Sequence, residues 1–185
     1  MEKEPIELSI QVNDLTVVIR PLKVEDALTS YRWRNDPEVW KYTGNRPDQV
    51  ITPEIETEWI KKVLTDKSSY RFAICVGDKD GTHYIGNIQL TNIQNGEGEY
   101  HIFIGEKSYW RLGIGTAATK LLLSYAFNVL GLKKIRLKVR SDNLGAIALY
   151  TKVGFVKDNG VTPNPELVDG AYWVSMVYNN PNTVI

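Results

Sequence analysis

The chain has 185 residues, which is enough for one well-packed domain and few for two. Lysine plus arginine equal aspartate plus glutamate at 22 each, so no overall field draws the protein toward nucleic acid or a membrane surface. The single cysteine, Cys75, excludes an internal disulfide and a cysteine metal cluster, and the two scattered histidines make no metal site.

No targeting signal is evident in the sequence. The N-terminus lacks the apolar core of a secretory signal, and no apolar run approaches the ~20 residues that span a bilayer. We expect a cytoplasmic protein in which residues 1–185 form a single domain with a core at about residues 15–178.

The first third of the chain predicts one strand followed by short helices. β-Branched residues cluster in residues 15–22 and a proline stops them, which is typical of a strand. Residues 24–34 have a helical pattern. Asp36 and Thr52 are each followed by proline, and each is expected to cap the start of a helix. The helix that follows Thr52 is expected to end near Leu64.

The remainder predicts a meander of three strands followed by a strand–helix–strand unit. Two strand-like runs flank a polar turn at 78–81, and a third run follows a turn at 96–98. We expect a long helix at residues 114–130, a strand at 133–140 and a short helix at 143–153. Two final strands are expected at residues 154–156 and 171–178. Gly131 and Gly154 are expected to end the two helices. This order predicts a mixed sheet with helices on both faces.

Gly113 and Gly115 lie directly before the long helix. A helix N-terminus presents unpaired N–H groups and the positive end of the helix dipole, and glycines let an anion approach the main chain closely. The alternative is a tight turn with no ligand. A dinucleotide-binding fingerprint is excluded, because Thr116, Ala117 and Ala118 follow Gly115 and the third glycine is absent.

Asn143 and Tyr150 are seven residues apart on the predicted short helix and therefore face the same side, about 10 Å from each other. Both could contact one ligand. In the alternative interpretation, Asn143 is only the helix cap and Tyr150 only a core aromatic residue.

These motifs resemble those of a known family. The stretch WRLGIG (residues 110–115) with its helix, and the stretch NLGAIALYTKVGF (residues 143–155), resemble the coenzyme A-binding core of the GNAT superfamily of N-acetyltransferases. IRPL and WRNDPEV, at residues 19–22 and 33–39, resemble its branch with the ribosomal-protein N-terminal acetyltransferases and relatives acting on nucleotide-linked amino sugars. The resemblance implies an α+β fold of the GNAT acyl-CoA N-acyltransferase type, with a mixed, mostly antiparallel sheet and helices on both faces.

The resemblance also implies acetyl-CoA as co-substrate and assigns the residues that bind it. The pyrophosphate is expected on the main-chain N–H groups of the glycine loop, which are those of Arg111, Leu112, Gly113, Ile114, Gly115 and Thr116. The pantetheine arm is expected along the strand residues Ile102, Phe103 and Ile104. Asn143 would hold the cofactor from the next helix, and Tyr150 would stand near the sulfur.

Acetyl transfer to an amine requires that the amine lose its proton, that the carbonyl oxygen receive a hydrogen bond, and that the leaving thiolate be protonated. Tyr150 fits the role of proton donor to the thiolate, and a main-chain N–H near Phe103 or Ile104 fits the oxyanion role. Glu99 and His101 share one face of their strand, where either could relay the amine proton. Alternatively, Glu99 binds the cation of the substrate, or both residues lie on a solvated face.

The chain departs from the family pattern at two positions. Arg111 stands where the family loop usually has glycine, and Lys138 stands where protein N-terminal acetyltransferases often have glutamate. Lys138 belongs to a one-sided basic stripe, which either meets an acidic substrate or is a solvated strand face; its members are Lys134, Arg136, Lys138 and Arg140. The resemblance implies an acceptor site against the N-terminal helices, which carry Trp33, Arg34, Trp40 and Arg46. The tryptophans either stack on the acceptor or pack in the core.

We therefore expect an N-acetyltransferase that acts on a primary amine of a small molecule or amino sugar. Direct transfer in a ternary complex is expected, since Cys75 lies in an apolar strand and no other nucleophile is evident. The alternatives are a ribosomal-protein-type N-terminal acetyltransferase, with an open groove for a peptide, and a non-catalytic acyl-CoA-binding module. The protein is expected to be a monomer or a homodimer.

Overall fold

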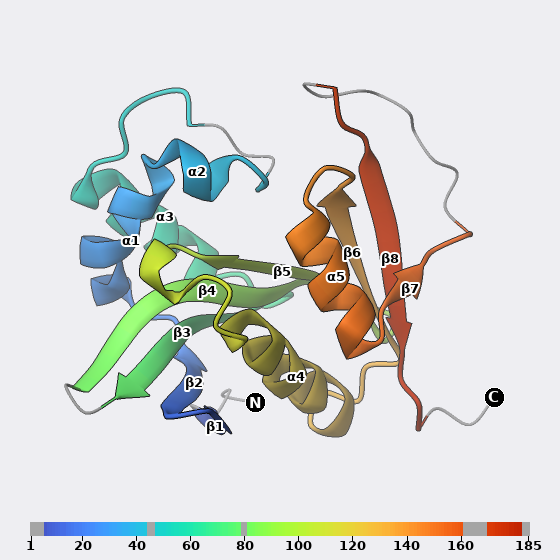
Figure 1. The fold of residues 1–185 in the computed structure, drawn as a ribbon. Helices are drawn as coiled ribbons and strands as arrows, with labels where there is room; N and C mark the ends of the chain where they lie inside the picture. The colour runs from blue at the N-terminus through green and yellow to red at the C-terminus, as the bar shows by residue number, and fades with distance from the viewer. Residues whose placement is uncertain (1–5, 44–46, 79–80, 161–169, 183–185) are drawn as a thin grey trace.

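A computed structural model of the chain describes residues 6–43, 47–78, 81–160 and 170–182 (Figure 1). Eight strands of the described residues form one sheet in the order β1-β2-β3-β4-β5-β6-β8-β7. The strands are β1 (Leu8–Val12), β2 (Leu15–Pro21), β3 (Tyr70–Asp78), β4 (Gly81–Gln94), β5 (Glu97–Ile104), β6 (Lys134–Arg140), β7 (Val156–Lys157) and β8 (Trp173–Asn179). The helices are α1 (Ala27–Arg34), α2 (Pro37–Trp40), α3 (Pro53–Leu64), α4 (Ile114–Asn128) and α5 (Leu144–Val153), with 3-10 turns η1 (Val24–Asp26) and η2 (Lys107–Tyr109).

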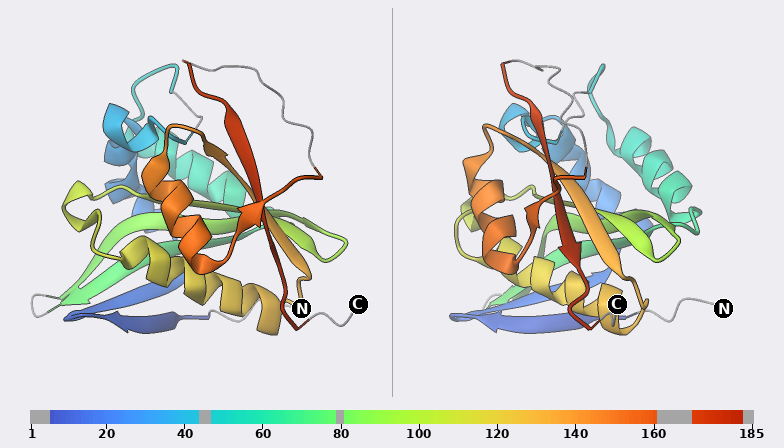
Figure 2. Two further views of the ribbon diagram at one scale, coloured as in Figure 1. Left: turned by 45° about the vertical axis from the view of Figure 1, so that its right-hand side comes forward. Right: turned by 90° about the vertical axis from the view of Figure 1, so that its right-hand side faces the viewer.

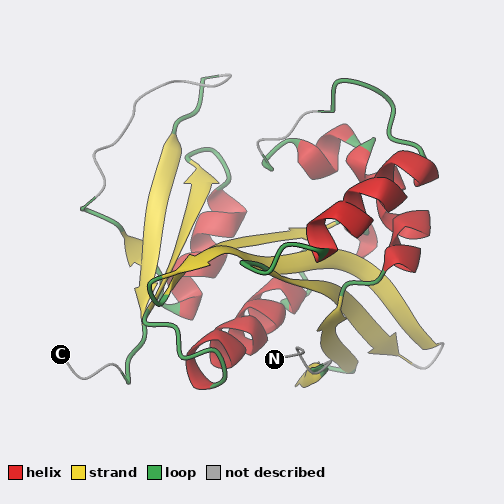
Figure 3. Cartoon of the chain, turned by 180° about the vertical axis from the view of Figure 1, so that it is seen from behind, coloured by secondary structure: helices red, strands yellow, loops and turns green. Residues whose placement is uncertain are grey.

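β5 and β6 are paired over a short stretch only and then diverge. Neighbouring strands are antiparallel throughout the described sheet except for this one pair, which is parallel. The parallel pairing joins only Glu97–Glu99 to Lys134–Arg136. Beyond it the two strands diverge, and the view from behind shows β6 and β8 at a steep angle to β4 and β5 (Figure 3). The C-terminal half of β5 therefore has no strand beside it on the β6 side.

Helices cover both faces of the sheet. Along β3, Phe72, Ile74 and Val76 pack in the large apolar cluster with α4 and α5, whereas Ala73 and Cys75 pack beneath α1 and α3. This alternation is that of a strand buried on both sides. Figure 2 shows the sheet between α4 and the three N-terminal helices. The predicted mixed sheet with helices on both faces is confirmed.

Most predicted helix ends are confirmed by their capping residues. Asp36, Thr52 and Asn143 each accept a hydrogen bond from a main-chain N–H in the first turn of the following helix. Gly131 and Gly154 follow α4 and α5 with left-handed φ values of 65° and 119°. No helix of the described segments is both long enough and apolar enough to cross a membrane.

Some boundaries differ from the predictions. α4 ends at Asn128 rather than at residue 130, because the N–H groups of residues 129 and 130 both donate to the carbonyl oxygen of Tyr125. β5 begins at Glu97, because the turn before it is formed by Asn95 and Gly96, both at positive φ. β1 was not predicted, although its side chains alternate between apolar and polar. Residues 79–80 of the predicted hairpin turn lie outside the described residues.

Candidate active site

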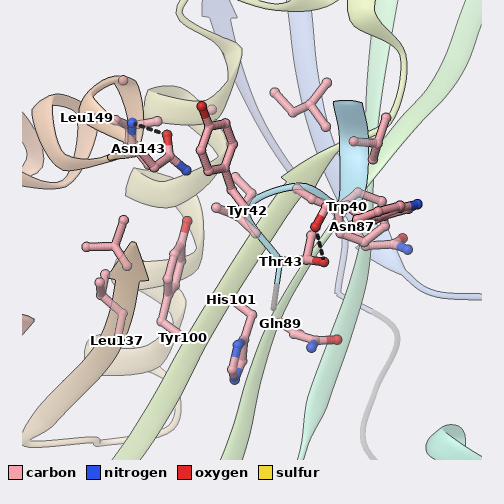
Figure 4. A pocket seen from close by; sticks show the side chains of 18 of the residues that line it. Trp40, Tyr42, Thr43, Asn87, Gln89, Tyr100, His101, Leu137, Asn143 and Leu149 are labelled. Carbon is pink, nitrogen blue, oxygen red and sulfur yellow. Dashed lines mark hydrogen bonds between the residues drawn. The ribbon is translucent and has the colours of Figure 1, made fainter. Parts of the chain in front are cut away.

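A cleft of about 1530 Å³ opens where β5 and β6 diverge (Figure 4). One end reaches the N-termini of α4 and α5, and the other reaches α1 and α2 above the middle of the sheet. The cleft joins the predicted cofactor loop to the predicted catalytic strand. Most predicted site residues line it, namely Trp33, Arg34, Trp40, Glu99, His101, Ile102, Phe103, Ile104, Arg111, Gly113, Ile114, Gly115, Thr116, Asn143 and Tyr150.

One predicted residue, Leu112, is not among the described residues that line the cleft. The side chain of Leu112 is 44% exposed on the outside of the loop, so this residue offers only its main chain. Arg46 lies outside the described residues.

The N-terminus of α4 has a row of main-chain N–H groups without acceptors among the described residues. The main-chain N–H groups of residues 111–116 donate to no acceptor among the described residues; the first bonded N–H is that of Ala117, which donates to the carbonyl oxygen of Gly113. No side chain caps α4, whereas side chains cap α2, α3 and α5. Unpaired N–H groups and the positive helix end together favour a bound anion.

Backbone conformation and packing explain the two loop glycines. Gly113 has a φ of 82°, in the left-handed region that glycine adopts without strain. At Gly115 a Cβ atom would lie 2.9 Å from Cδ1 of Leu149, so glycine there lets α5 pack closely on α4. Arg111, the departure from the family loop, also has a left-handed φ of 64°. The loop therefore holds at Arg111 a conformation that glycine would adopt more easily.

The edge of β5 that faces the opening has no strand beside it beyond Glu99. Gly105 donates its N–H to Ile85 on β4 at 2.7 Å, whereas the carbonyl oxygen of Ile104 accepts the indole N–H of Trp110 at 2.8 Å. Main-chain groups alternate between the two sides of a strand. The N–H and C=O groups of Ile102 and Ile104 therefore point into the cleft, and those of Phe103 point toward β4. Of the two predicted oxyanion donors, only Ile104 has the required direction.

His101 and Glu99 lie on the cleft face of β5. Their side chains are 51% and 53% exposed, and Nε2 of His101 lies 3.9 Å from Oε2 of Glu99. Nε2 also lies 3.1 Å from the hydroxyl of Thr91, while Asn92 donates to Glu99 at 3.0 Å. Desolvation by the cleft walls lowers the pKa of His101, and the carboxylate of Glu99 raises it by less. His101 is therefore a neutral imidazole near pH 7 and can accept a proton.

Tyr150 reaches the cleft from α5. Its ring packs edge-on against Tyr100 at 5.8 Å and against Phe155 at 5.8 Å, and the residue is 7% exposed. Burial raises the pKa of Tyr150, so the phenol keeps its proton at neutral pH. Its hydroxyl bonds to no described residue and is not buried away from the cleft. It is therefore open to the cleft as a proton donor.

Asn143 caps α5, which is one of the two interpretations left open by the sequence. Its Oδ1 accepts the N–H of Ala146 at 3.2 Å. The side-chain amide also borders the cleft (Figure 4). The capping bond uses the oxygen and leaves the NH₂ group for a ligand.

The wall of the cleft beside α1 and α2 carries aromatic side chains. Trp33 is buried against Phe103 at 6.1 Å, and its indole N–H donates to Glu106 at 2.9 Å. Trp33 also lies directly over Gly105, where any Cβ atom would clash with the ring. Trp40, Tyr42 and Thr43 follow on the same side of the cleft (Figure 4).

The predicted basic stripe on β6 is largely neutralised. Arg136 pairs with Glu97 and with Asp158, and Lys134 pairs with Glu97. Arg140 is buried and pairs with Asp142 at 3.0 Å. Lys138 is exposed at the cleft and has no ion pair with any described residue. The stripe therefore does not present one uniform basic surface.

Sequence reasoning missed Arg71, Asn87 and Gln89, which line the floor of the cleft. Gln89 pairs across the sheet with Arg71 on β3 and with His101 on β5. The signal was present, because Asn87 and Gln89 are polar residues in an otherwise apolar stretch of β4. Cys75 is buried on β3, and no group of ligating side chains in the described part of the chain could hold a metal.

Comparison with known proteins gives concordant matches. A family model described as an acetyltransferase (GNAT) domain matches residues 16–156. Spermidine N(1)-acetyltransferase of Escherichia coli K12 is 31% identical over 141 residues, which cover 76% of this chain and 73% of that protein.

Solved structures that share the fold include the following two. Spermidine N-acetyltransferase of Vibrio cholerae, in complex with CoA and spermine, has a TM-score of 0.75 at 24% identity and covers 88% of this chain and 95% of its own. Mycobacterium smegmatis RimJ, in complex with CoA-disulfide, has a TM-score of 0.77 at 20% identity, over 95% and 88% of the two chains.

Proposed function

The chain belongs to the GNAT family and is an acetyl-CoA-dependent N-acetyltransferase, and we propose that it acetylates the primary amine of a small molecule or amino sugar. The transfer is direct, within a ternary complex. The supporting observation is that three features line one cleft: the N–H groups of residues 111–116 without acceptors, the edge of β5 without a neighbouring strand, and the side chain of His101.

The residues fit acetyl-CoA in two separate ways. The N–H groups at the start of α4 match a pyrophosphate. The N–H and C=O groups of Ile102 and the N–H of Ile104, which have no strand beside them, match the amides of a pantetheine arm. When bound, acetyl-CoA supplies the thioester that is cleaved. Asn143 offers a further donor from α5.

Three groups of the chain carry the proposed chemistry. His101 accepts the proton that the amine releases as its nitrogen bonds to the acetyl carbon. The N–H of Ile104 donates to the carbonyl oxygen while negative charge develops there. Tyr150 donates a proton to the sulfur as the carbon–sulfur bond breaks. His101 then releases its proton to solvent and Tyr150 takes one up from solvent, so the products are the acetylated amine and free CoA, with both residues back in their starting states.

Glu99 has a supporting role in this scheme. Its carboxylate lies 3.9 Å from Nε2 of His101, where it stabilises the imidazolium that forms. It is also placed to attract the ammonium form of an incoming acceptor. The sequence left Glu99 and His101 as alternative bases, and the depressed pKa of His101 favours the histidine.

The test is release of free thiol from acetyl-CoA with a panel of amines. We expect turnover with small primary amines and none without acceptor. Turnover confined to peptides with a free N-terminus would favour the ribosomal-protein-type alternative. Acetyl-CoA binding without turnover of any acceptor would favour a non-catalytic acyl-CoA-binding module. We place the reaction in the cytoplasm of the cell and expect a monomer or homodimer.

A further inference from the structure

Arg71 lies in the floor of the cleft without an anionic partner. Its Nη1 donates to the neutral amide oxygen of Gln89. Its Nε is buried and donates to none of the described residues. No described carboxylate is within ion-pairing distance of it, and the charge of Asp66 acts only from further away. Arg71 is half-buried, and neither its Nε nor its Nη2 donates to a described residue.

The surroundings of Arg71 make this end of the cleft positive. Its guanidinium lies 5.7 Å from the centre of the Trp59 ring, and that of Arg34 lies 5.0 Å from the same ring. Arg34 is paired with the buried Glu56 at 3.5 Å. Of these two guanidinium groups, Arg71 alone lacks a carboxylate, so the pair keeps a net positive charge.

A row of three side chains joins Arg71 to the proposed reaction centre. The strand register places Arg71 opposite Gln89, and Gln89 opposite His101, on one face of the sheet. Neighbouring strands are about 4.8 Å apart, so the main chains of Arg71 and His101 are separated by about 10 Å. An acceptor molecule of modest size can therefore contact both residues.

We propose that Arg71 binds an oxyanion on the acceptor, a carboxylate or a phosphate, and so positions the amine at His101. The Nη2–H groups of Arg71 bond to no described residue, and a hydrogen bond from a guanidinium to such an anion is charge-assisted and strong. The separation of two strands suits an anionic group several bonds from the nitrogen. The inference rests on the proposed function and narrows its acceptor to an amine that carries a negative charge.

The experiment compares acceptors that differ in the anion alone. Glucosamine 6-phosphate is paired with glucosamine, and lysine with cadaverine, and spermidine is added as a polycation. We expect the wild type to prefer the anionic member of at least one pair. Arg71→Gln should raise KM for that member about ten- to hundredfold, with little change for its partner, since a hydrogen bond to a charged group is lost. The pair that responds distinguishes phosphate from carboxylate.

Matched variants decide whether Arg71 is responsible. Lys138→Gln removes another exposed cation of the cleft and should leave the preference unchanged, while Arg71→Lys should restore part of it. KM for acetyl-CoA should be unaltered in all three variants, which shows that they fold. Loss of the preference in Lys138→Gln instead, an equal loss on both members of a pair, or a wild-type preference for spermidine would overturn the inference. Failure to acetylate any amine would instead contradict the proposed function.

Discussion

Tyr150 is held by ring contacts with Tyr100 and Phe155, and its hydroxyl makes no hydrogen bond to the described residues. Tyr150→Phe keeps those ring contacts and removes only the proton donor. We expect kcat to fall about a hundredfold or more, as for the loss of a general acid, and the melting temperature to stay nearly unchanged. Steady-state kinetics with saturating acetyl-CoA measure the effect.

A matched control for Tyr150 is Tyr178→Phe, because Tyr178 packs against the same Phe155 ring at 5.5 Å and does not line the cleft. That variant should retain its activity. Full turnover by Tyr150→Phe would remove the tyrosine from the mechanism.

If His101 is the base, its protonation should produce an acidic limb in the pH profile of kcat/KM. Its pKa lies below the ordinary value of 6.5, because desolvation disfavours the imidazolium. As pH falls through that lowered pKa, the imidazole gains a proton and can no longer accept one from the amine. The contribution of His101 should therefore appear as a loss of activity at a pH below the ordinary histidine range. The raised pKa of Tyr150 adds no basic limb in the assayed range.

Two variants test whether the acidic limb comes from His101. In His101→Gln the acidic limb should vanish together with most of the rate, whereas in Glu99→Gln it should persist and move to lower pH, since a carboxylate that stabilises the imidazolium is lost. An unchanged limb in His101→Gln would exclude the histidine as the base.

Residue types and spacing predicted part of this site. Asn143 and Tyr150 could be paired because the helical period brings residues seven apart to one side, and the glycine loop was evident from its position before a helix. Arg71 could not be found in this way. Its role depends on strand register, on the ring of Trp59 and on the missing carboxylate, and none of these is encoded in local sequence.

The loop before α4 makes a prediction at the scale of the element. Gly113 has a φ of 82° and Gly131, at the far end of the same helix, has a φ of 65°. A Cβ atom would have space at both positions. Alanine at either one should therefore cost about 1–2 kcal/mol of stability from backbone strain alone.

The two glycine variants should differ in ligand binding. Gly113→Ala shifts the open N–H groups, so we expect the dissociation constant for acetyl-CoA to rise about tenfold, as for weakened hydrogen bonds to a charged group. Gly131→Ala should leave it unchanged. Isothermal titration measures both. Equal affinities in the two variants would place the pyrophosphate somewhere other than at this loop.

Helix starts were readable from the sequence because capping is local: Asp36, Thr52 and Asn143 each bond within the next three residues. β1 was not predicted although Leu8, Ile10 and Val12 alternate with polar residues, because a strand of five residues depends on its pairing with β2 and has only a weak signal of its own. The divergence of β5 and β6 had no local signal. It arises where the parallel pairing stops after three residues, and it creates the cleft.

At the scale of the whole molecule, two apolar clusters pack on the two faces of one sheet. The order of strands and helices predicted that architecture, because alternating elements need a layer on each face. The position of the acceptor region between α1, α2 and the sheet could be expected only by resemblance. Its depth and polarity depend on side chains that come from six or more elements.

The most direct test of the account is thermal melting with saturating acetyl-CoA, with NAD as the control. A ligand at one hundred times its dissociation constant adds about 2.7 kcal/mol to the free energy of unfolding. For a domain of this size the melting temperature should rise by roughly 5 to 10 °C with acetyl-CoA and stay constant with NAD. An unchanged melting temperature with acetyl-CoA, or a rise with NAD, would contradict the assignment of the α4 loop and the roles that depend on it.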